Sequence, residues 1–305
     1  MTYVYFVIWL ERKLLARVML RIGPLHVGRY AGILQVMADF IKLLGKEIII
    51  PSKADRKLYM AMPIFAVLVA ALPLAVIPLD NSWVIFRSDY SLLYFLGISS
   101  LFPVVAVLTG WASNNKYSFI GGLRAAYQLL GYEVPMHFSL ASVAILAGSL
   151  DIVRIVREQE SICFIFLAPI SFLVYFISAM AELERSPFDI PEAEQEIVVG
   201  WMTEYTGISF GLFYLAQYMR LCVGSLLVTA LFLGGGYGPA FIPPFAWFLI
   251  KSVAVVTFII LVRGAFPRMR MDQLLNAAWS TLTPIAIFSI LATLIVRGFV
   301  KPILV

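Results

Sequence analysis

Residues 181–205 read AELERSPFDIPEAEQEIVVGWMTEY and lie between two long apolar segments. Charged residues fill only 13% of the chain, whereas soluble domains carry roughly 25%. This one stretch nevertheless holds seven of the 18 acidic residues: Glu182, Glu184, Asp189, Glu192, Glu194, Glu196 and Glu204. Ionisable side chains at membrane depth are costly and usually mark ion or proton pathways. The pattern therefore predicts a membrane protein whose acidic segment handles protons.

The apolar runs predict an all-α polytopic protein with about eight transmembrane helices, because a helix needs ~20 apolar residues to cross a bilayer. The mean hydropathy is +0.91, and 61% of the residues are hydrophobic. The first span covers about residues 1–20 and is interrupted by charges from Glu11 onward. The whole chain, 1–305, is interpreted as one transmembrane domain without a soluble domain or an internal repeat. The other seven spans are expected at residues 58–80, 92–112, 121–150, 162–184, 204–234, 241–265 and 275–300.

Residues 31–46 have a different pattern, with apolar side chains on one helical face and polar ones elsewhere. Such a pattern is typical of an amphipathic helix that lies along the membrane surface. A loop helix that faces only solvent is the alternative, and the neighbouring spans favour the interfacial one. The apolar positions are Ile33, Leu34, Met37, Ile41 and Leu44.

The basic residues sort by connection. Sixteen of the 23 Lys and Arg fall on the odd-numbered connections, and five fall on the even ones and the C-terminal segment. Since cytoplasmic loops carry the excess of Lys and Arg, the odd connections are expected on the cytoplasmic side of the cell membrane. Both termini then face outside, and residues 185–203 form an acidic cytoplasmic connection. This sorting also argues against nucleic acid as a partner.

The carboxylates within or beside spans carry the predicted chemistry. Pro191 followed by three glutamates is typical of a helix start, which explains Glu192 and Glu194 without any function. It does not explain Glu182 and Glu204, which border apolar spans. Glu133 lies inside the fourth span, where desolvation favours its protonated form. A series of such groups can pass protons, although a single glutamate bonded to a tyrosine or the backbone is the simpler alternative.

No metal centre is expected from this sequence. The two cysteines, Cys163 and Cys222, lie in apolar runs, and the histidines His26 and His137 are far apart. A Cys-x-x-Cys or Cys/His cluster is missing from the sequence, so neither a zinc nor an iron–sulfur site is predicted.

Five segments together resemble one family of respiratory complex I, that of its H subunit. They are ERKLLARVMLRIGP (11–24), ILQVMADFIKLLGKE (33–47), WASNNKYSFIGGLRAAYQLLGYEV (111–134), AELERSPFDIPEAEQEIVVGWMTEYTGISFGLFYLAQY (181–218) and RGAFPRMRMDQLLNAAW (263–279). The resemblance runs in order from Glu11 to about Pro284, and eight spans plus an amphipathic helix agree with that family.

The resemblance implies a subunit that forms the membrane part of a quinone channel and couples quinone reduction to proton translocation. Quinone would be a substrate reduced in a neighbouring subunit, with no cofactor bound covalently here. Implied partners are the bilayer, peripheral-arm iron–sulfur and quinone-site subunits, and small and antiporter-like membrane subunits. The implied channel residues are Arg12, Arg21, Asp39, Arg185, Asp189, Phe210, Phe213, Arg268 and Arg270. The implied proton path is Glu133, Glu182, Glu192, Glu194, Glu204 and Gln217.

One departure falls inside the best-matched segment. The family usually has a glutamate where this chain has Gln217, and a neutral amide cannot carry a proton in the same way. Two other classes of protein stay open at this point. One is the homologous subunit of an energy-converting hydrogenase, a formate hydrogenlyase or a dehydrogenase of the reduced deazaflavin F-420. The other is a stand-alone ion transporter.

Overall fold

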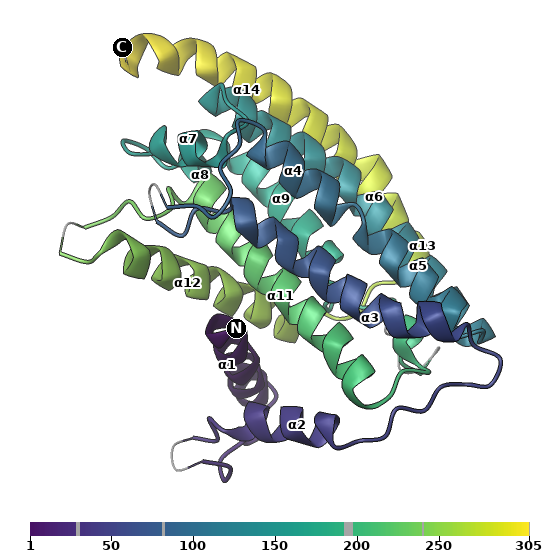
Figure 1. Cartoon of the computed structure of the whole chain (residues 1–305). Helices are drawn as coiled ribbons and strands as arrows, with labels where there is room; N and C mark the ends of the chain where they lie inside the picture. The colour runs from purple at the N-terminus through teal and green to yellow at the C-terminus, as the bar shows by residue number, and fades with distance from the viewer. Residues whose placement is uncertain (29–30, 81–82, 192–197, 240, 305) are drawn as a thin grey trace.

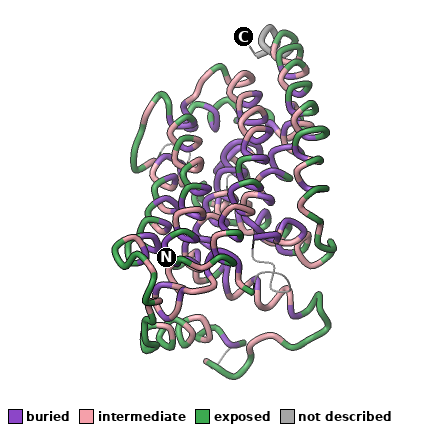
Figure 2. Tube along the Cα trace, turned by 90° about the vertical axis from the view of Figure 1, so that its right-hand side faces the viewer, coloured by how far each residue is buried: buried purple, intermediate pink, exposed green. Residues whose placement is uncertain are grey.

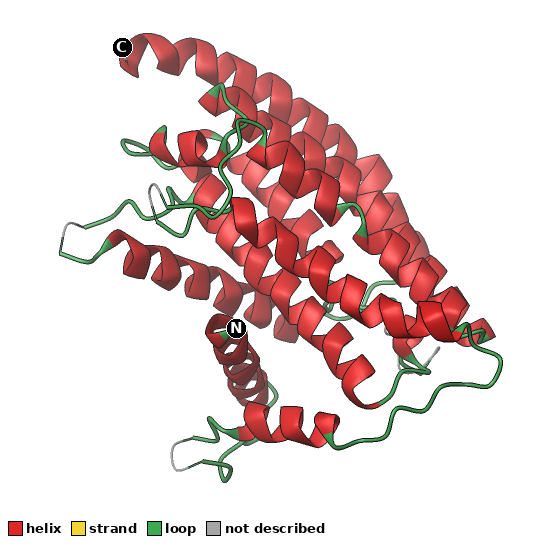
Figure 3. Ribbon diagram, viewed as in Figure 1, coloured by secondary structure: helices red, strands yellow, loops and turns green. Residues whose placement is uncertain are grey.

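The computed structural model describes the backbone of residues 1–28, 31–80, 83–191, 198–239 and 241–304, and this part is helical without strands (Figure 3). The elements are α1 (Thr2–Val18), α2 (Gln35–Leu44), α3 (Arg56–Ala71), η1 (Leu72–Val76), α4 (Ser91–Ser99), α5 (Phe102–Ala112), α6 (Lys116–Ala147), α7 (Ile152–Arg157), α8 (Phe164–Leu167), α9 (Pro169–Glu182), η2 (Gly200–Met202), α11 (Gly207–Phe232), α12 (Pro244–Ala265), α13 (Met271–Asn276), the π-helical η3 (Ala277–Leu282) and α14 (Thr283–Leu304).

Six of the helical stretches are long and apolar enough to cross a membrane, which confirms the all-α polytopic class. The other two expected spans are present as shorter helices, α1 with 17 residues and α9 with 14. At ~1.5 Å per residue these reach about 26 and 21 Å, less than the ~30 Å hydrocarbon core. The six are Arg56–Val76, Ser91–Ala112, Lys116–Ala147, Gly207–Phe232, Pro244–Ala265 and Met271–Phe299.

Two expected spans are broken where the sequence has proline. Residues 92–112 form α4 and α5, which are separated at Ser100 and Leu101 just before Pro103. Residues 162–184 form α8 and α9, separated at Ala168 before Pro169. Proline lacks the amide hydrogen that a helix interior needs, so it is favoured at a helix start.

Helix α6 is the centre of one half of the bundle and packs against α5, α9 and α14, while α11 packs against α3, α12 and α1 (Figure 1). Glycines allow the closest approaches to α6. A Cβ on Gly121 would lie 2.7 Å from the backbone N of Trp201, and one on Gly122 would lie 2.7 Å from the Ala106 carbonyl oxygen. Small residues let membrane helices approach each other in this way.

Helix α2 lies at one end of the molecule, against α1 and α11 (Figure 1). It covers Gln35–Leu44, within the expected range 31–46, and none of its residues is buried. Apolar side chains such as Met37 and Ile41 are exposed, and the trace at this end is mostly exposed (Figure 2). Its position at a membrane surface remains a prediction.

Lys251, inside α12, is held by the loop that follows α11. Its Nζ donates hydrogen bonds to the carbonyl oxygens of Leu233 (2.6 Å), Gly235 (3.0 Å) and Tyr237 (2.8 Å). The ammonium group therefore satisfies the carbonyl oxygen of Leu233, the C-cap of α11, and two carbonyl oxygens of the loop that follows.

Candidate functional site

Glu11 of α1 is the most enclosed carboxylate at the end of the bundle where α1 and α2 meet. Its side chain is 2% exposed, although it lies in an otherwise apolar helix. Arg185 Nη1 donates to its Oε1 at 3.0 Å, and Arg263 Nη1 donates to the same oxygen. One buried carboxylate thus joins α1, the acidic connection and α12, because two guanidinium groups offset its desolvation.

Arg12, the next residue of α1, points to the other side of that helix. Its guanidinium forms an ion pair with Asp39 of α2, and Gln35 donates to the second Asp39 oxygen at 2.9 Å. Both ion-pair partners are partly exposed. The structure therefore brings together Arg12 and Asp39, two of the predicted channel residues.

Tyrosines of α11 lie between these two charge groups. The hydroxyls of Tyr214 and Tyr218 are 3.2 Å apart, one helical turn from each other. The Arg185 guanidinium lies 4.6 Å from the centre of the Tyr218 ring, and the charge of Arg12 interacts with both phenols. Asp39, Arg12, the tyrosine pair, Arg185 and Glu11 thus form one connected polar chain.

A second charge group surrounds Arg220 of α11. Its Nη2 donates to the carbonyl oxygen of Glu182, and its guanidinium carbon lies 3.6 Å from the centre of the Phe102 ring. The charges of Glu182 and Glu184 both interact with it. Glu182 and Arg220 also line a cavity of about 50 Å³, which has room for one or two water molecules.

Glu133 lies in the middle of α6 and is 7% exposed. Ser100, which lies in the break between α4 and α5, donates to its Oε1. His137 lies one turn further along α6, with its Nε2 3.6 Å from the same oxygen. The charges of Glu133 and Glu182 interact, so the α6 carboxylate is within electrostatic reach of the end of α9.

Glu204 is the first residue of the expected span 204–234 and lies before α11, where it meets the start of α6. Asn115, the N-cap of α6, donates from Nδ2 to its Oε1, and Tyr59 donates to its backbone oxygen at 2.7 Å. The Tyr59 ring is stacked on Tyr205 at 4.1 Å between centroids. Burial, and then the neighbouring Tyr59, raise the pKa of Tyr205, which therefore stays neutral at physiological pH.

The remaining predicted site residues are spread around these groups. The exposed Arg268 donates to the Asp189 carbonyl oxygen, and Gln217 is buried in α11. Arg21 is exposed and contacts the sulfur of Met19, and the exposed Arg270 caps α13, so neither joins the polar chain. The predicted Glu192 and Glu194 lie outside the described residues.

The two predicted phenylalanines of α11 have different surroundings. Phe213 is fully buried, with its ring edge-on to Trp201 at 5.1 Å and to Tyr205 at 4.9 Å. Phe210 is half-buried and stacks on Tyr214 at 6.3 Å. Phe210 therefore lies beside the polar chain, whereas Phe213 contributes to the packing that holds η2.

Several residues of this site were not predicted from the sequence. Glu11, Arg220 and Arg263 take part in it, and so does Glu184, which was predicted only as a member of the acidic segment. A usable signal existed for two of them, since Glu11 and Arg220 are charges inside apolar runs. Across the described residues, no three His, Cys, Asp or Glu side chains gather as a metal site.

These features define a class of protein: a polytopic helical membrane protein in which buried ionisable side chains connect one end of the bundle with the middle of its helices. The family described as NADH dehydrogenase matches residues 1–294, and the chain belongs to that family. It is 44% identical over 302 residues to the H subunit of the NADH-quinone oxidoreductase of Geobacillus kaustophilus, an alignment that covers 98% of this chain and 91% of the relative.

Relatives from other genera are similarly close. The NADH-quinone oxidoreductase H subunit numbered 2 of Syntrophobacter fumaroxidans is 43% identical over 297 residues, covering 94% of this chain and 89% of the relative. The H subunit of Carboxydothermus hydrogenoformans is 42% identical over 297 residues, covering 96% and 83%. The family expected from the five quoted segments is thereby confirmed.

Proposed function

We propose that this chain is the membrane subunit of a proton-translocating NADH-quinone oxidoreductase that gives quinone access to the enzyme and couples its reduction to proton movement. The observation that carries the proposal is the connected polar chain from Asp39 and Arg12 through Tyr214 and Tyr218 to Arg185. Reduction of a quinone to a quinol takes up two electrons and two protons. Side chains near the head group must therefore supply protons or balance the charge that develops there.

The part near α2 is proposed to be the quinone entrance. Asp39 and Arg12 are partly exposed, and Phe210 lies beside the tyrosine pair. An apolar tail would pass the aromatic side of α11, while a polar head group would meet the ion pair. Arg21, Arg185, Asp189, Phe213, Arg268 and Arg270 remain proposed channel residues.

The carboxylates deeper in the bundle are proposed to be the proton path. Glu182, Glu133 and Arg220 interact electrostatically, and a small cavity that can hold water lies beside two of them. Glu204 is held by Asn115 at the start of α6. Glu192 and Glu194 are included from the family resemblance, and Gln217 is proposed to order water.

The proposal extends to partners and orientation. Electrons would reach quinone in a neighbouring peripheral subunit with iron–sulfur partners, and protons would pass toward small and antiporter-like membrane subunits. The chain would lie in the cell membrane with both termini outside and the acidic connection inside, following the distribution of Lys and Arg.

Two variants of the assembled complex in proteoliposomes test the two halves of the proposal. Asp39→Leu should raise the KM for quinone severalfold and leave electron transfer from NADH to artificial peripheral-arm acceptors unchanged. Glu133→Gln should lower quinone reduction and proton pumping together in a complex that still assembles. Glu160→Gln, an exposed acid remote from the polar chain, is the matched control. Wild-type quinone kinetics in Asp39→Leu, or wild-type pumping in Glu133→Gln, would contradict the corresponding half.

A further inference from the structure

An open polar hollow of about 400 Å³ lies at the far end of the bundle, away from the candidate site. Helix α6 begins beside η2, where Ser118 donates to the Trp201 carbonyl oxygen, and it ends at Ala147, which lines the hollow. The 32 residues of α6 therefore separate the two places by about 48 Å at ~1.5 Å per residue. This basic hollow is lined by Ala147, Gly148, Ser149, Arg154, Arg157 and Glu158.

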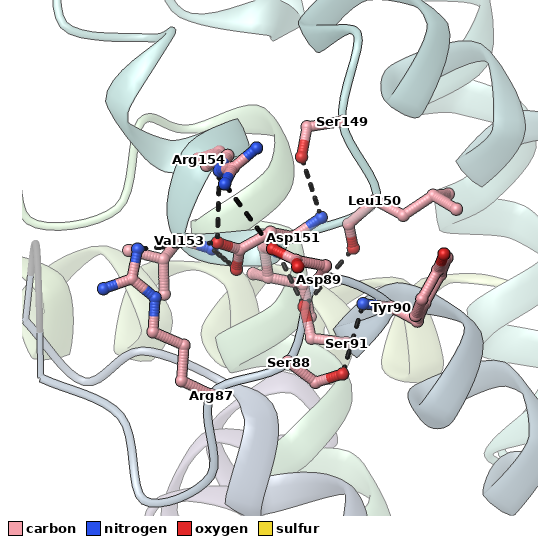
Figure 4. A network of polar contacts seen from close by, with 11 residues as sticks. Arg87, Ser88, Asp89, Tyr90, Ser91, Ser149, Leu150, Asp151, Val153 and Arg154 are labelled. Carbon is pink, nitrogen blue, oxygen red and sulfur yellow. Dashed lines mark hydrogen bonds and ion pairs between the residues drawn. The ribbon is translucent and has the colours of Figure 1, made fainter.

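Four charges beside the basic hollow neutralise one another (Figure 4). Arg154 lies 3.5 Å from Asp89 and 3.8 Å from the buried Asp151, and Arg87 lies 3.9 Å from Asp151. Two guanidinium groups thus face two carboxylates. This quartet needs no further counter-charge.

Three charges at the basic hollow remain outside that balance. Arg157 and Glu158 line it and form no ion pair with any residue in the described part of the chain. Arg297 of α14 approaches from another helix, since a Cβ on Gly148 would lie 2.5 Å from its Nη2. Among Arg157, Glu158 and Arg297, two positive charges and one negative charge leave an excess of one positive charge, and Glu160, which follows α7, does not line the hollow.

The excess charge lies at the depth where phospholipid head groups are found. Arg297 is two residues before the end of the membrane-spanning stretch Met271–Phe299, and the hollow is formed by the last turn of α6 and by α7. On the same helix as Arg297, Leu291, Leu294 and Ile295 expose 55%, 49% and 62% of their surface. Acyl chains can run along this apolar face while the head group reaches the arginines.

We propose that the basic hollow binds the phosphodiester of an anionic phospholipid from the bilayer. Guanidinium groups bind phosphate oxygens with paired, charge-assisted hydrogen bonds, so arginines at a helix end can hold an anionic head group. A lipid with one net negative charge also matches the single excess positive charge, whereas a zwitterionic lipid leaves it uncompensated.

The sequence supplies an independent reason to expect a ligand here. Only five of the 23 Lys and Arg fall on the even-numbered connections and the C-terminal segment, and three of them, Arg154, Arg157 and Arg297, gather at this one place. The excess of Lys and Arg on cytoplasmic connections sets the orientation of a membrane protein, so it does not account for arginines on these even-numbered connections.

Photo-crosslinking of the assembled complex tests the proposal. The complex is placed in phosphatidylcholine nanodiscs that contain phosphatidylglycerol with a photoreactive acyl chain, and labelled peptides are mapped by mass spectrometry. Labelling is expected on α14 near Leu291–Ile295. The double variant Arg157→Gln with Arg297→Gln should lower this labelling at least about tenfold, the factor that corresponds to ~1.4 kcal/mol of binding free energy. If the double variant does not assemble, Arg157→Gln is measured alone. Arg157 is exposed on a short helix, and its substitution should lower the labelling severalfold.

Three controls identify the ligand. Arg87→Gln removes an arginine of the same face that does not line the basic hollow, and it should change labelling less than about twofold. Equal labelling by a phosphatidylethanolamine probe, or an equal loss in Arg87→Gln, would overturn the proposal. Displacement of the lipid by excess inorganic phosphate would assign the hollow to a free anion and would overturn it as well.

Discussion

The two ends of the bundle each bury a carboxylate, and they do so in different ways. At the far end, Asp151 is 1% exposed, and its Oδ1 accepts the Val153 amide at 3.0 Å as the N-cap of α7 (Figure 4). At the other end, Glu11 is 2% exposed, and the bonds described for its carboxylate come from Arg185 and Arg263. Asp151 is hydrogen-bonded within its own chain turn and also lies 3.9 Å from Arg87 and 3.8 Å from Arg154, whereas the hydrogen bonds to Glu11 come only from side chains of the acidic connection and of α12 among the described contacts.

The difference indicates which buried carboxylate can change its energy when a charged side chain near it moves. A cap bonded to an adjacent amide keeps its partner as long as the helix exists, so its role is local. A carboxylate held by two side chains from distant segments changes its energy whenever either segment moves. Glu11 is therefore suited to link the proposed quinone entrance with the acidic connection, and Asp151 is suited to close a turn.

The largest expected effect comes from removing Glu11. Glu11→Ala leaves the buried Arg185 and the partly buried Arg263 without their shared counter-charge, and breaking a buried ion pair typically costs about 3–5 kcal/mol. We expect much less assembled complex in membranes and a lower midpoint in thermal unfolding of the purified complex. Glu11→Gln keeps the volume and one acceptor and should lie between Ala and wild type. A wild-type unfolding midpoint for Glu11→Ala would contradict the view that Glu11 holds distant segments together while Asp151 acts within its own turn.

A smaller effect is expected at Asp151. Asp151→Ala removes the N-cap of α7 and should destabilise by about 1 kcal/mol, while Asp151→Asn keeps the acceptor and should lose only part of that. Quinone turnover per assembled complex should equal that of wild type in both variants. Reduced turnover in a fully assembled Asp151→Asn complex would show that the far end also takes part in catalysis.

Gln217 tests whether the proposed proton path needs a neutral polar side chain in addition to its carboxylates. Gln217→Glu should leave turnover within a few-fold, because the titrating groups are proposed to be Glu133, Glu182 and Glu204. Gln217→Leu, of similar size, removes the polar contact and should slow turnover and pumping. Normal pumping by Gln217→Leu, measured in proteoliposomes, would reduce the residue to packing.

The smallest effect is expected at Tyr205. Its buried hydroxyl has no hydrogen-bond partner among the described residues, and burial raises its pKa above the usual 10.0. Tyr205→Phe should change stability by less than about 0.5 kcal/mol below pH 10. Above pH 10 the unfolded chain ionises more readily than the folded one, so wild type loses stability there and the variant loses less. An altered activity profile between pH 6 and 9 would assign the phenol a role.

Local patterns predicted most of the helices, because hydrophobic length and proline act within one segment. They missed the breaks at Ser100 and Ala168 and overestimated the length of α9, since a long apolar run does not reveal where a helix is divided. Arg12 and Asp39 were predicted as residues of one channel only through the family resemblance, and their ion pair was not predicted.

The partners of Glu11 could not be derived from local patterns. Arg185 and Arg263 lie 174 and 252 residues away in the sequence, and which helices meet is decided by packing across the whole bundle. Arg220 is a charge inside an apolar run and can be found in the sequence, but its contact with Phe102 depends on how α11 crosses the break after α4. A buried charge can therefore be found in a sequence more readily than its partner.

Lys251 has a consequence for how the chain is made. It is the eighth residue of the 22-residue helix α12, where an unpaired ammonium makes entry into a bilayer costly. The carbonyls that receive its hydrogen bonds, at Leu233, Gly235 and Tyr237, are synthesised before it. When α12 leaves the ribosome, the preceding loop can already accept the charge. Membrane insertion of α12 is therefore expected to depend on α11, so that the two helices enter the bilayer as a pair.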